Sequence, residues 1–322
     1  MSLIDDSFLM NHTCLRIKDP KVSIDFYVKN FGMKLINEFS FPSMKFTIYM
    51  LGFENDDNKK LNWAARSGVL ELCHNWGTEN DDNFKINNGN GSENRGFGHI
   101  CFSVDNISQV ESDLLDKGVS FKKKLSDGRQ KDIAFCLDPD GYWIELIENG
   151  INKIDNKTDS KSYKFNHSMI RVKDPEKSLK FYCDILGFKL LKQKKFDDAK
   201  FTLYFLGYDH SDQEITDISD REGIIELTHN WGTESDPNFK GYHNGNSTEN
   251  GAIQGFGHTC ISCSNPSKFC QELLEKYPDL DWSLKFNQGN IKSIGFIRDP
   301  DGYSIEIIPH NIFENGNDEY KI

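Results

Sequence analysis

The chain has 322 residues and a net charge of −12, which disfavours nucleic acid or an anionic membrane as a partner. No apolar run approaches the ~18 residues of a membrane span, and the N-terminus lacks the basic and apolar regions of a signal peptide. The eight cysteines follow no disulfide spacing. We therefore expect a cytoplasmic protein with reduced thiols, long enough for about two domains.

An internal repeat divides the chain. Residues 12–35 and 167–190 are identical at 11 of 24 paired positions, and GVLELCHNWGT at 68–78 returns as GIIELTHNWGT at 223–233. A polar, turn-rich stretch separates the two copies. We therefore expect one domain at residues 1–150 and a second at 163–322, joined by a linker at about 151–162.

The first half of each copy reads as a strand, a helix and further strands. In the first copy an alternating strand at 12–18 precedes Asp19-Pro20, which is typical of a helix start, and Gly32 predicts the end of that helix. Apolar strands follow at 46–52 and 68–75.

The second half repeats this scheme after an Asn-rich stretch at 87–94, which predicts a surface loop with a lid as one role to consider. A strand at 98–104 leads to a helix at about 106–116, and two strands follow at 132–137 and 142–148. The chain thus predicts four βαβββ modules, an α+β fold in two tandem domains.

Each module carries one His or Glu near a strand end that could bind a metal. They are His12, Glu71, His99 and Glu145 in the first copy, and His167, Glu226, His258 and Glu306 in the second. Imidazole and carboxylate groups suit zinc or another divalent metal and leave coordination positions for substrate. A hydrogen-bonded core residue is the usual explanation for any one of them, but the recurrence of all four favours a metal site.

Strand alternation places an arginine and an asparagine on the same face as these ligands. Arg16 follows His12 and Asn75 follows Glu71, each four residues on, or roughly 13 Å along the strand. The second copy repeats the arrangement with Arg171 and Asn230. A metal at one end and Arg plus Asn at the other suit an elongated ligand that carries a carboxylate, although a surface arginine is the simpler alternative.

Two further motifs are predicted to be structural. His74 and His229 point to the strand face opposite the glutamates, so we expect them to pack or to support the site rather than to bind metal. Cys260 and Cys263 form a C-x-x-C sequence, but the three-residue spacing in a strand turns them to opposite faces.

The motifs LRIKDPKVSIDFY, MKFTIYMLGF, LELCHNWGT, RGFGHI and DPDGYWIEL resemble those of glyoxalase I (lactoylglutathione lyase), in the vicinal-oxygen-chelate superfamily. The resemblance covers essentially the whole chain, once per copy, as in the fused two-domain form. It implies a metal-dependent isomerase that converts the hemithioacetal of methylglyoxal and glutathione to S-D-lactoylglutathione through a metal-bound enediolate. Glutathione and methylglyoxal, or other 2-oxoaldehydes, are then the expected partners.

The resemblance also implies how the ligands combine. In the family each metal takes two ligands from each of two chains, so here they would cross between the copies, at the domain interface of a monomer. Many eukaryotic members have Gln at the first ligand, where both copies have His; we expect Zn²⁺, with Ni²⁺, Co²⁺, Fe²⁺ or Mn²⁺ as alternatives. Site one would comprise His12, Glu71, His258 and Glu306, and site two His167, Glu226, His99 and Glu145. The family's catalytic base matches Glu145 and Glu306, with Glu226 and Glu71 as the opposing carboxylates.

Three positions tied in the family to glutathione contacts differ between the copies. The first copy has Arg95, Lys123 and Trp143, and the second has Gln254, Leu284 and Ser304. Because the ligands cross, the three altered positions would fall in site one. We therefore expect two pseudo-equivalent sites of unequal affinity for glutathione, with site two the tighter.

Two alternatives stay open at this point. An extradiol dioxygenase or epimerase could use the same scaffold, but a dioxygenase needs two His, one carboxylate and open positions, and a fourth ligand at Glu71 or Glu226 argues against it. A non-catalytic binding protein for an anionic ligand would not need the bases Glu145 and Glu306.

Overall fold

The computed structural model describes residues 3–151, 153–210 and 217–314, and its elements follow the predicted repeat. The first module consists of β1 (Leu9–Ile17), α1 (Pro20–Phe31), β2 (Lys34–Phe41), β3 (Phe46–Gly52) and β4 (Val69–Asn75). The second consists of β5 (Phe97–Val104), α2 (Ile107–Asp116), β6 (Phe121–Lys123), β7 (Ile133–Leu137) and β8 (Trp143–Glu148).

The second copy repeats both modules with one local difference. Its first module consists of β9 (Lys164–Arg171), α3 (Pro175–Leu179), β10 (Lys189–Phe196), β11 (Phe201–Gly207) and β12 (Ile224–Asn230). Its second consists of β13 (Phe256–Cys263), α4 (Pro266–Lys276), β14 (Trp282–Leu284), β15 (Gly295–Arg298) and β16 (Ser304–Pro309). After α3 the helix continues as a π-helix over Lys180–Ile185, where α1 stays regular.

The ends of helix α1 lie where the sequence predicts them. The Asp19 side chain accepts a hydrogen bond from the backbone N–H of Lys21, and Pro20 occupies the first turn, where no backbone donor is needed. Gly32 follows in the left-handed conformation at φ 73°, which other residues rarely adopt. This start and stop therefore fix the path of the chain from β1 to β2.

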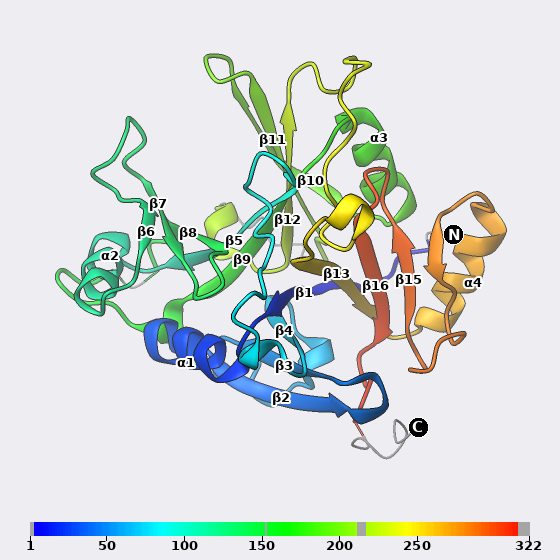
Figure 1. Cartoon of the computed structure of the whole chain (residues 1–322), viewed down its shortest axis with the longest axis horizontal. Coiled ribbons are helices and arrows are strands. Elements are labelled where there is room, and N and C mark those ends of the chain that lie inside the picture. The colour runs from blue at the N-terminus through cyan, green and yellow to red at the C-terminus, as the bar shows by residue number, and fades with distance from the viewer. Residues whose placement is uncertain (1–2, 152, 211–216, 315–322) are drawn as a thin grey trace.

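The strands form two eight-stranded sheets, and each sheet combines half of one domain with half of the other. The first sheet has the order β14-β15-β16-β13-β1-β4-β3-β2, and the second has the order β10-β11-β12-β9-β5-β8-β7-β6. At the junctions β1 pairs antiparallel with β13, and β5 with β9. Figure 1 shows the blue strand β1 beside β13, with the red β16 and orange β15 continuing that sheet.

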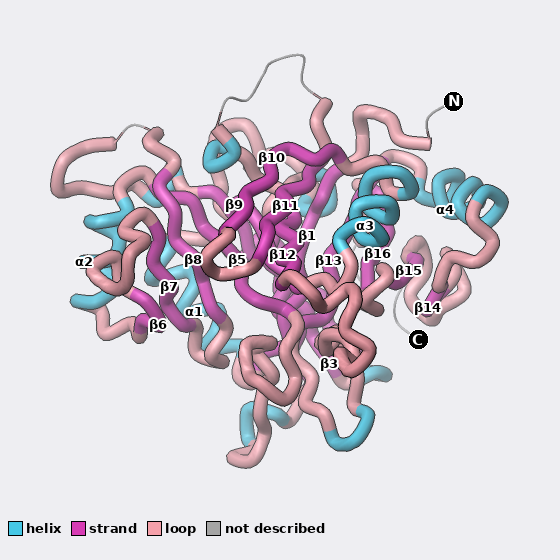
Figure 2. The backbone as a smooth tube through the Cα atoms, turned by 90° about the horizontal axis from the view of Figure 1, so that it is seen from above, coloured by secondary structure: helices cyan, strands magenta, loops and turns pink. Residues whose placement is uncertain are grey.

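The two faces of each sheet differ in character. Leu15 and Ile17 of β1, and Ile100 and Phe102 of β5, are buried in one large hydrophobic core, while the alternating His12 and His99 point to the opposite faces. Figure 2 shows the strands at the centre, with α1 and α2 on one side and α3 and α4 on the other. Among the described residues no helix is long and apolar enough to span a membrane. The predicted α+β fold of two tandem βαβββ pairs is confirmed.

Phe102 joins three parts of this core, so truncating it is expected to destabilise the whole chain. Its ring lies 5.0 Å from Phe31 of α1, 5.2 Å from Phe53 and 5.5 Å from Phe165 of β9, measured between ring centroids. We expect Phe102→Ala to lower the free energy of unfolding by about 3–5 kcal/mol, the usual cost of a large core cavity.

Equilibrium urea unfolding measures this loss, with the exposed Leu115→Ala as the control, which is expected to change stability by less than about 0.5 kcal/mol. A Phe102→Ala variant as stable as the control would contradict the shared core.

Candidate active sites

Four predicted ligands converge at the junction of β1 with β13. His12 and Glu71 come from the first domain, and His258 and Glu306 from the second. The Nε2 atom of His12 lies 3.1 Å from Nε2 of His258, 3.2 Å from Oε2 of Glu71 and 3.3 Å from Oε2 of Glu306. The structure thus brings together the four residues of site one.

The other four ligands meet in the same way at the junction of β5 with β9. His167 Nε2 lies 3.2 Å from Oε2 of both Glu145 and Glu226, and 3.3 Å from His99 Nε2. His99 Nε2 lies 3.3 Å from Glu145 and 4.0 Å from Glu226. These are the four residues of site two, again two from each domain.

The donor sets fit a divalent metal. All four donor atoms of each site lie within 4.8 Å of one another. Metal bonds of about 2.1 Å place neighbouring ligands about 3.0 Å apart and opposite ligands about 4.2 Å apart in octahedral geometry. The observed separations of 3.1–4.0 Å fall within that range.

Two asparagines orient the first histidine of each site. The amide group of Asn11 donates hydrogen bonds to the backbone carbonyls of Trp63 and Arg66. Its oxygen therefore faces Nδ1 of His12, at 2.7 Å. Because that oxygen can only accept, the His12 proton sits on Nδ1 and leaves the Nε2 lone pair for a metal. Asn166 holds His167 in the same way at 2.7 Å. This pair was missed from the sequence, although an Asn-His dipeptide in both copies signals it.

One glutamate in each site, Glu145 in site two and Glu306 in site one, is held in its ionised form. Burial raises the pKa of Glu145, but the imidazoles of His99 and His167 outweigh it and keep that pKa well below its usual range. Burial also raises the pKa of Glu306, but its contacts with His12 and His258 have the larger effect and lower that pKa below its usual range. Each site thus presents a carboxylate able to bind a cation or accept a proton.

The histidines predict how metal binding depends on pH. Burial lowers the pKa of His12, but the Cys260 thiol and the carboxylates of Glu306 and Glu71 outweigh burial and place the net pKa well above its usual range. In the metal-free protein both ring nitrogens of His12 are therefore protonated at neutral pH. A metal that binds Nε2 must displace the proton from that nitrogen. The affinity for Zn²⁺ is therefore expected to rise with pH until the pH passes the raised pKa of His12, with about one proton released per site.

Competitive chelator titrations at several pH values measure this affinity, and calorimetry in buffers of different ionisation enthalpy counts the protons. The Asn11→Ala variant, which frees Nδ1, should bind Zn²⁺ more weakly at every pH. An affinity independent of pH would contradict the assignment of protons.

Site two opens into a cavity of about 540 Å³ that is rich in cationic side chains. Arg95, Arg171, Lys192 and Lys194 line it, together with Phe135 and Trp143. Asp132 and Asp217 also line this cavity, which we call cavity two. A ligand there meets four positive charges and, besides the metal-site residues Glu145 and Glu226, the carboxyl groups of Asp132, Asp217 and Glu148.

Arg171 is fixed by the loop before β5. Its Nη1 donates to the carbonyls of Gly89, Gly96 and Phe97, and its Nη2 donates to Oδ1 of Asn90 at 2.9 Å. Burial first, and then the charge of Arg95, lower the pKa of Arg171 to about 10. The guanidinium of the exposed Arg95 lies close enough to the buried Arg171 to lower its pKa, and two cations so close together favour an anionic ligand. The Asn-rich loop thus supports the arginine, a more specific role than the surface loop expected from composition.

Site one opens into a smaller and more apolar space of about 320 Å³, which we call cavity one. Among the residues that the structure describes, Arg16 is the single arginine or lysine in its lining, and Asn75 lines it too. The Arg16 guanidinium donates to Asn246 and to the carbonyl of Phe256, as Arg171 does to Asn90 and Phe97. The frame of the two cavities is therefore conserved while their charge differs.

Of the other residues predicted to contact glutathione, some line the cavities and some do not. Trp143 and Asn230 line cavity two, whereas Lys123 is absent from its lining and donates to the carbonyls of Gln130 and Ile133 at 2.7 Å. Lys123 therefore supports the cavity wall in this structure. In the second copy Gln254 donates to the Asn246 carbonyl, and neither Leu284 nor Ser304 lines cavity one.

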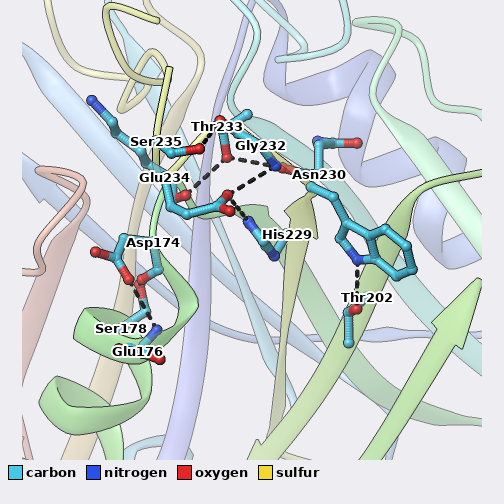
Figure 3. A network of polar contacts seen from close by, with 12 residues as sticks. Asp174, Glu176, Ser178, Thr202, His229, Asn230, Gly232, Thr233, Glu234 and Ser235 are labelled. Atoms are coloured by element: carbon cyan, nitrogen blue, oxygen red, sulfur yellow. Dashed lines mark hydrogen bonds and ion pairs between the residues drawn. The ribbon is translucent and has the colours of Figure 1, made fainter. Parts of the chain in front are cut away.

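His229 lies away from the metal ligands and organises the turn after β12. Its Nε2 contacts Oε2 of Glu234 at 2.7 Å, and the same oxygen accepts from the N–H of Gly232 (Figure 3). Thr233 donates to the carbonyl of Lys173 and so ties this turn to the end of β9. His74 pairs with Glu79 at 2.8 Å in the first copy. Both histidines thus hold the strand ends that carry Asn75 and Asn230.

Comparison with known proteins agrees with the fold and the repeat. The profile of the Glyoxalase/Bleomycin resistance protein/Dioxygenase superfamily matches residues 9–146 and 164–307. A Saccharomyces cerevisiae protein named glyoxalase I is 52% identical over 314 residues, 96% of this chain and 94% of its own length. Lactoylglutathione lyase of Schizosaccharomyces pombe is 44% identical over 306 residues, 94% and 96% of the two chains.

A solved structure shares the whole architecture. The crystal structure of glyoxalase I from Zea mays superimposes with a TM-score of 0.69 at 26% identity, covering 96% of this chain and 95% of that one. The resemblance found in the sequence motifs is therefore confirmed. The chain belongs to the Glyoxalase/Bleomycin resistance protein/Dioxygenase superfamily and, within it, to the glyoxalase I family.

Proposed function

We propose that this chain is a lactoylglutathione lyase that isomerises the hemithioacetal of methylglyoxal and glutathione to S-D-lactoylglutathione. The observation that carries the proposal is site two, where two imidazoles and two glutamate side chains meet beside a cavity with four cationic side chains. The close relatives named glyoxalase I and lactoylglutathione lyase support the same reaction.

The reaction moves one proton between adjacent carbons. A bound divalent metal would polarise the substrate carbonyl and stabilise negative charge on its oxygens. Glu145 accepts the proton from the carbon that carries sulfur and returns it to the neighbouring carbon, so that one C–H bond breaks, one forms, and no redox partner is needed. Glu226 is the carboxylate across the site from Glu145, and Thr228 donates to its Oε1 at 2.9 Å. This hydrogen bond fixes the Glu226 carboxylate.

Cavity two has charges that match glutathione. The tripeptide carries two carboxylates and one ammonium group, and the cavity offers Arg95, Arg171 and two lysines together with Asp132, Asp217 and Glu148. We propose that Arg95, which is exposed, and the buried Arg171 together bind one carboxylate, with Asn230 beside them. The lysines of β10 then face the second carboxylate near the entrance.

The crossed ligands support a monomer with two complete sites, formed by domains at 1–150 and 163–322. We propose Zn²⁺ as the metal, since His and carboxylate oxygen are donors that it accepts, and Ni²⁺, Co²⁺, Fe²⁺ and Mn²⁺ fit the same donors. We further propose that the protein acts in the cytoplasm. Its eight cysteines are all free thiols, six of them buried, which suits a reducing compartment.

Thioester absorbance with methylglyoxal and glutathione tests the proposal, on chelator-treated protein and on protein reloaded with single metals. We expect thioester only when both glutathione and a metal are present. Failure with every metal, combined with retained binding of S-methylglutathione, would replace the enzyme by a binding protein for an anionic ligand. Oxygen uptake with a catechol would instead favour a dioxygenase.

A further inference from the structure

Two cysteines lie close together in the wall of cavity one. Cys14 of β1 and Cys73 of β4 both line this cavity, and both are free thiols. The two strands pair in parallel (Figure 1), with Cys14 opposite Glu71 and Arg16 opposite Cys73. Because alternate residues of a strand share a face, the two thiols lie on the same side of the sheet as the metal ligand Glu71.

The two thiols are in direct contact. The Cys14 side chain is hydrogen-bonded to that of Cys73. The Cys14 sulfur also lies against the backbone of Gly257, where an added Cβ would come within 2.6 Å of it, next to the ligand His258. Cys14 is 3% exposed, whereas Cys73 is partly exposed and lines the cavity. The pair is therefore fixed by its surroundings and can be reached through the cavity.

Cavity two has no such pair. At the 155-residue offset the second copy has Met169 and Thr228 at these positions, and both line cavity two. Among the described residues that line cavity two there is no cysteine. The repeated fold thus accommodates a methionine and a threonine where the first copy has two thiols.

The geometry favours a bridging ion over a disulfide. Residues that are two positions apart in register on neighbouring strands have Cα atoms about 8 Å apart, given a strand spacing of about 4.8 Å and a rise of about 3.3 Å per residue. A disulfide needs Cα atoms closer than about 7 Å. Metal–sulfur bonds of about 2.3 Å place two thiolates about 3.8 Å apart at a tetrahedral centre, which thiols in contact can match without a shift of the backbone.

We propose that Cys14 and Cys73 form a dithiol site for one soft ion, of the chemical class of Cu⁺ or trivalent arsenic, inside cavity one. This site goes beyond the proposed isomerase, because neither cysteine belongs to the four metal ligands of site one. Along β1 the dithiol lies between His12 and Arg16. A bound ion therefore obstructs cavity one and leaves cavity two open.

Binding of arsenic at this site needs no oxidant. A trivalent arsenical with two hydroxyl groups loses both of them as water. Two As–O bonds and two S–H bonds break, and two As–S bonds and two O–H bonds form. Both thiols are consumed together, which distinguishes this reaction from modification of a single cysteine.

Phenylarsine oxide tests the site in zinc-loaded protein, because it bridges neighbouring thiols. We expect one phenylarsenic group per chain by intact mass spectrometry, with two thiols lost. Cys14→Met and Cys73→Thr, which introduce the residues of the second copy, should take up none. Cys183→Ser, which removes a partly exposed cysteine of the π-helix, is the matched control and should keep the adduct.

Cu⁺ is the second probe, titrated without oxygen against a colorimetric chelator, with the zinc content measured throughout. We expect one Cu⁺ per chain with the zinc retained. Either variant should weaken Cu⁺ binding about 100-fold, the share of one ligand in a structural thiolate site. Uptake of the arsenical alone assigns the pair to arsenic, and uptake of Cu⁺ alone assigns it to the cation.

An arsenic adduct that persists in Cys14→Met or in Cys73→Thr would overturn the proposal, as would wild-type protein that takes up neither probe. Both results would leave the isomerase intact. Absence of thioester formation would instead overturn the proposed function and not this site, because the adduct is counted by mass.

Discussion

Glu145→Gln is expected to lower kcat for the methylglyoxal–glutathione hemithioacetal by about 10²–10⁴-fold, the range for loss of a general base. The amide keeps the shape of the side chain and one oxygen for the metal, but it cannot accept the proton. Because Glu145 belongs to the site with four cationic side chains, most of the turnover should depend on it. Steady-state kinetics with measured metal content separate loss of the base from loss of the ion.

The equivalent change in site one is the matched control. Glu306→Gln removes the carboxylate at the corresponding position, beside a cavity in which the described part of the chain places one guanidinium, that of Arg16. It should leave most of the turnover of the glutathione adduct in place. Equal losses in the two variants would contradict the unequal roles of the sites.

Arg95→Gln is expected to raise KM for the hemithioacetal about 10–100-fold with little change in kcat, because it removes a charge-assisted contact to a substrate carboxylate far from the reacting carbons. Glutamine is the residue that the second copy has at this position, Gln254, so the fold accepts it. The pKa of Arg171 should also rise toward its usual value once the neighbouring charge is gone.

Gln254→Arg provides the reciprocal test in cavity one. A single added guanidinium there should improve S-methylglutathione binding at site one less than Arg95→Gln weakens it at site two, because the lysines of β10 have no counterpart. If Arg95→Gln left KM unchanged, Arg95 would not contribute to substrate binding and the prediction would be contradicted.

Alternation and capping predict most of the fold. The strand at 46–52 and the helix between Asp19 and Gly32 lie where the sequence places them, because their apolar spacing and caps are local signals. Strand β10 was not located, since KLLKQKKF carries four lysines, which interrupt the apolar alternation of this edge strand. Lys192 and Lys194 were missed for the same reason, and they line cavity two.

The sequence alone does not predict which βαβββ module of the first domain forms a sheet with which module of the second. His12 alternates to the same face whether β1 pairs with β13 or with another strand, so the crossing of the ligands came from the family resemblance. The aromatic wall of cavity one was missed because Phe41, Trp63 and Phe313 are far apart in sequence. Their contact depends on tertiary packing, for which no local pattern exists.

The crossing of the ligands is the central claim, and the metal stoichiometry of two double variants tests it directly. His12→Ala with Glu306→Ala removes two ligands of site one and should leave one tightly bound ion per chain. His12→Ala with Glu145→Ala removes one ligand from each site and should leave none. If the second variant kept one ion and the first kept none, each site would belong to one domain and the account would be contradicted.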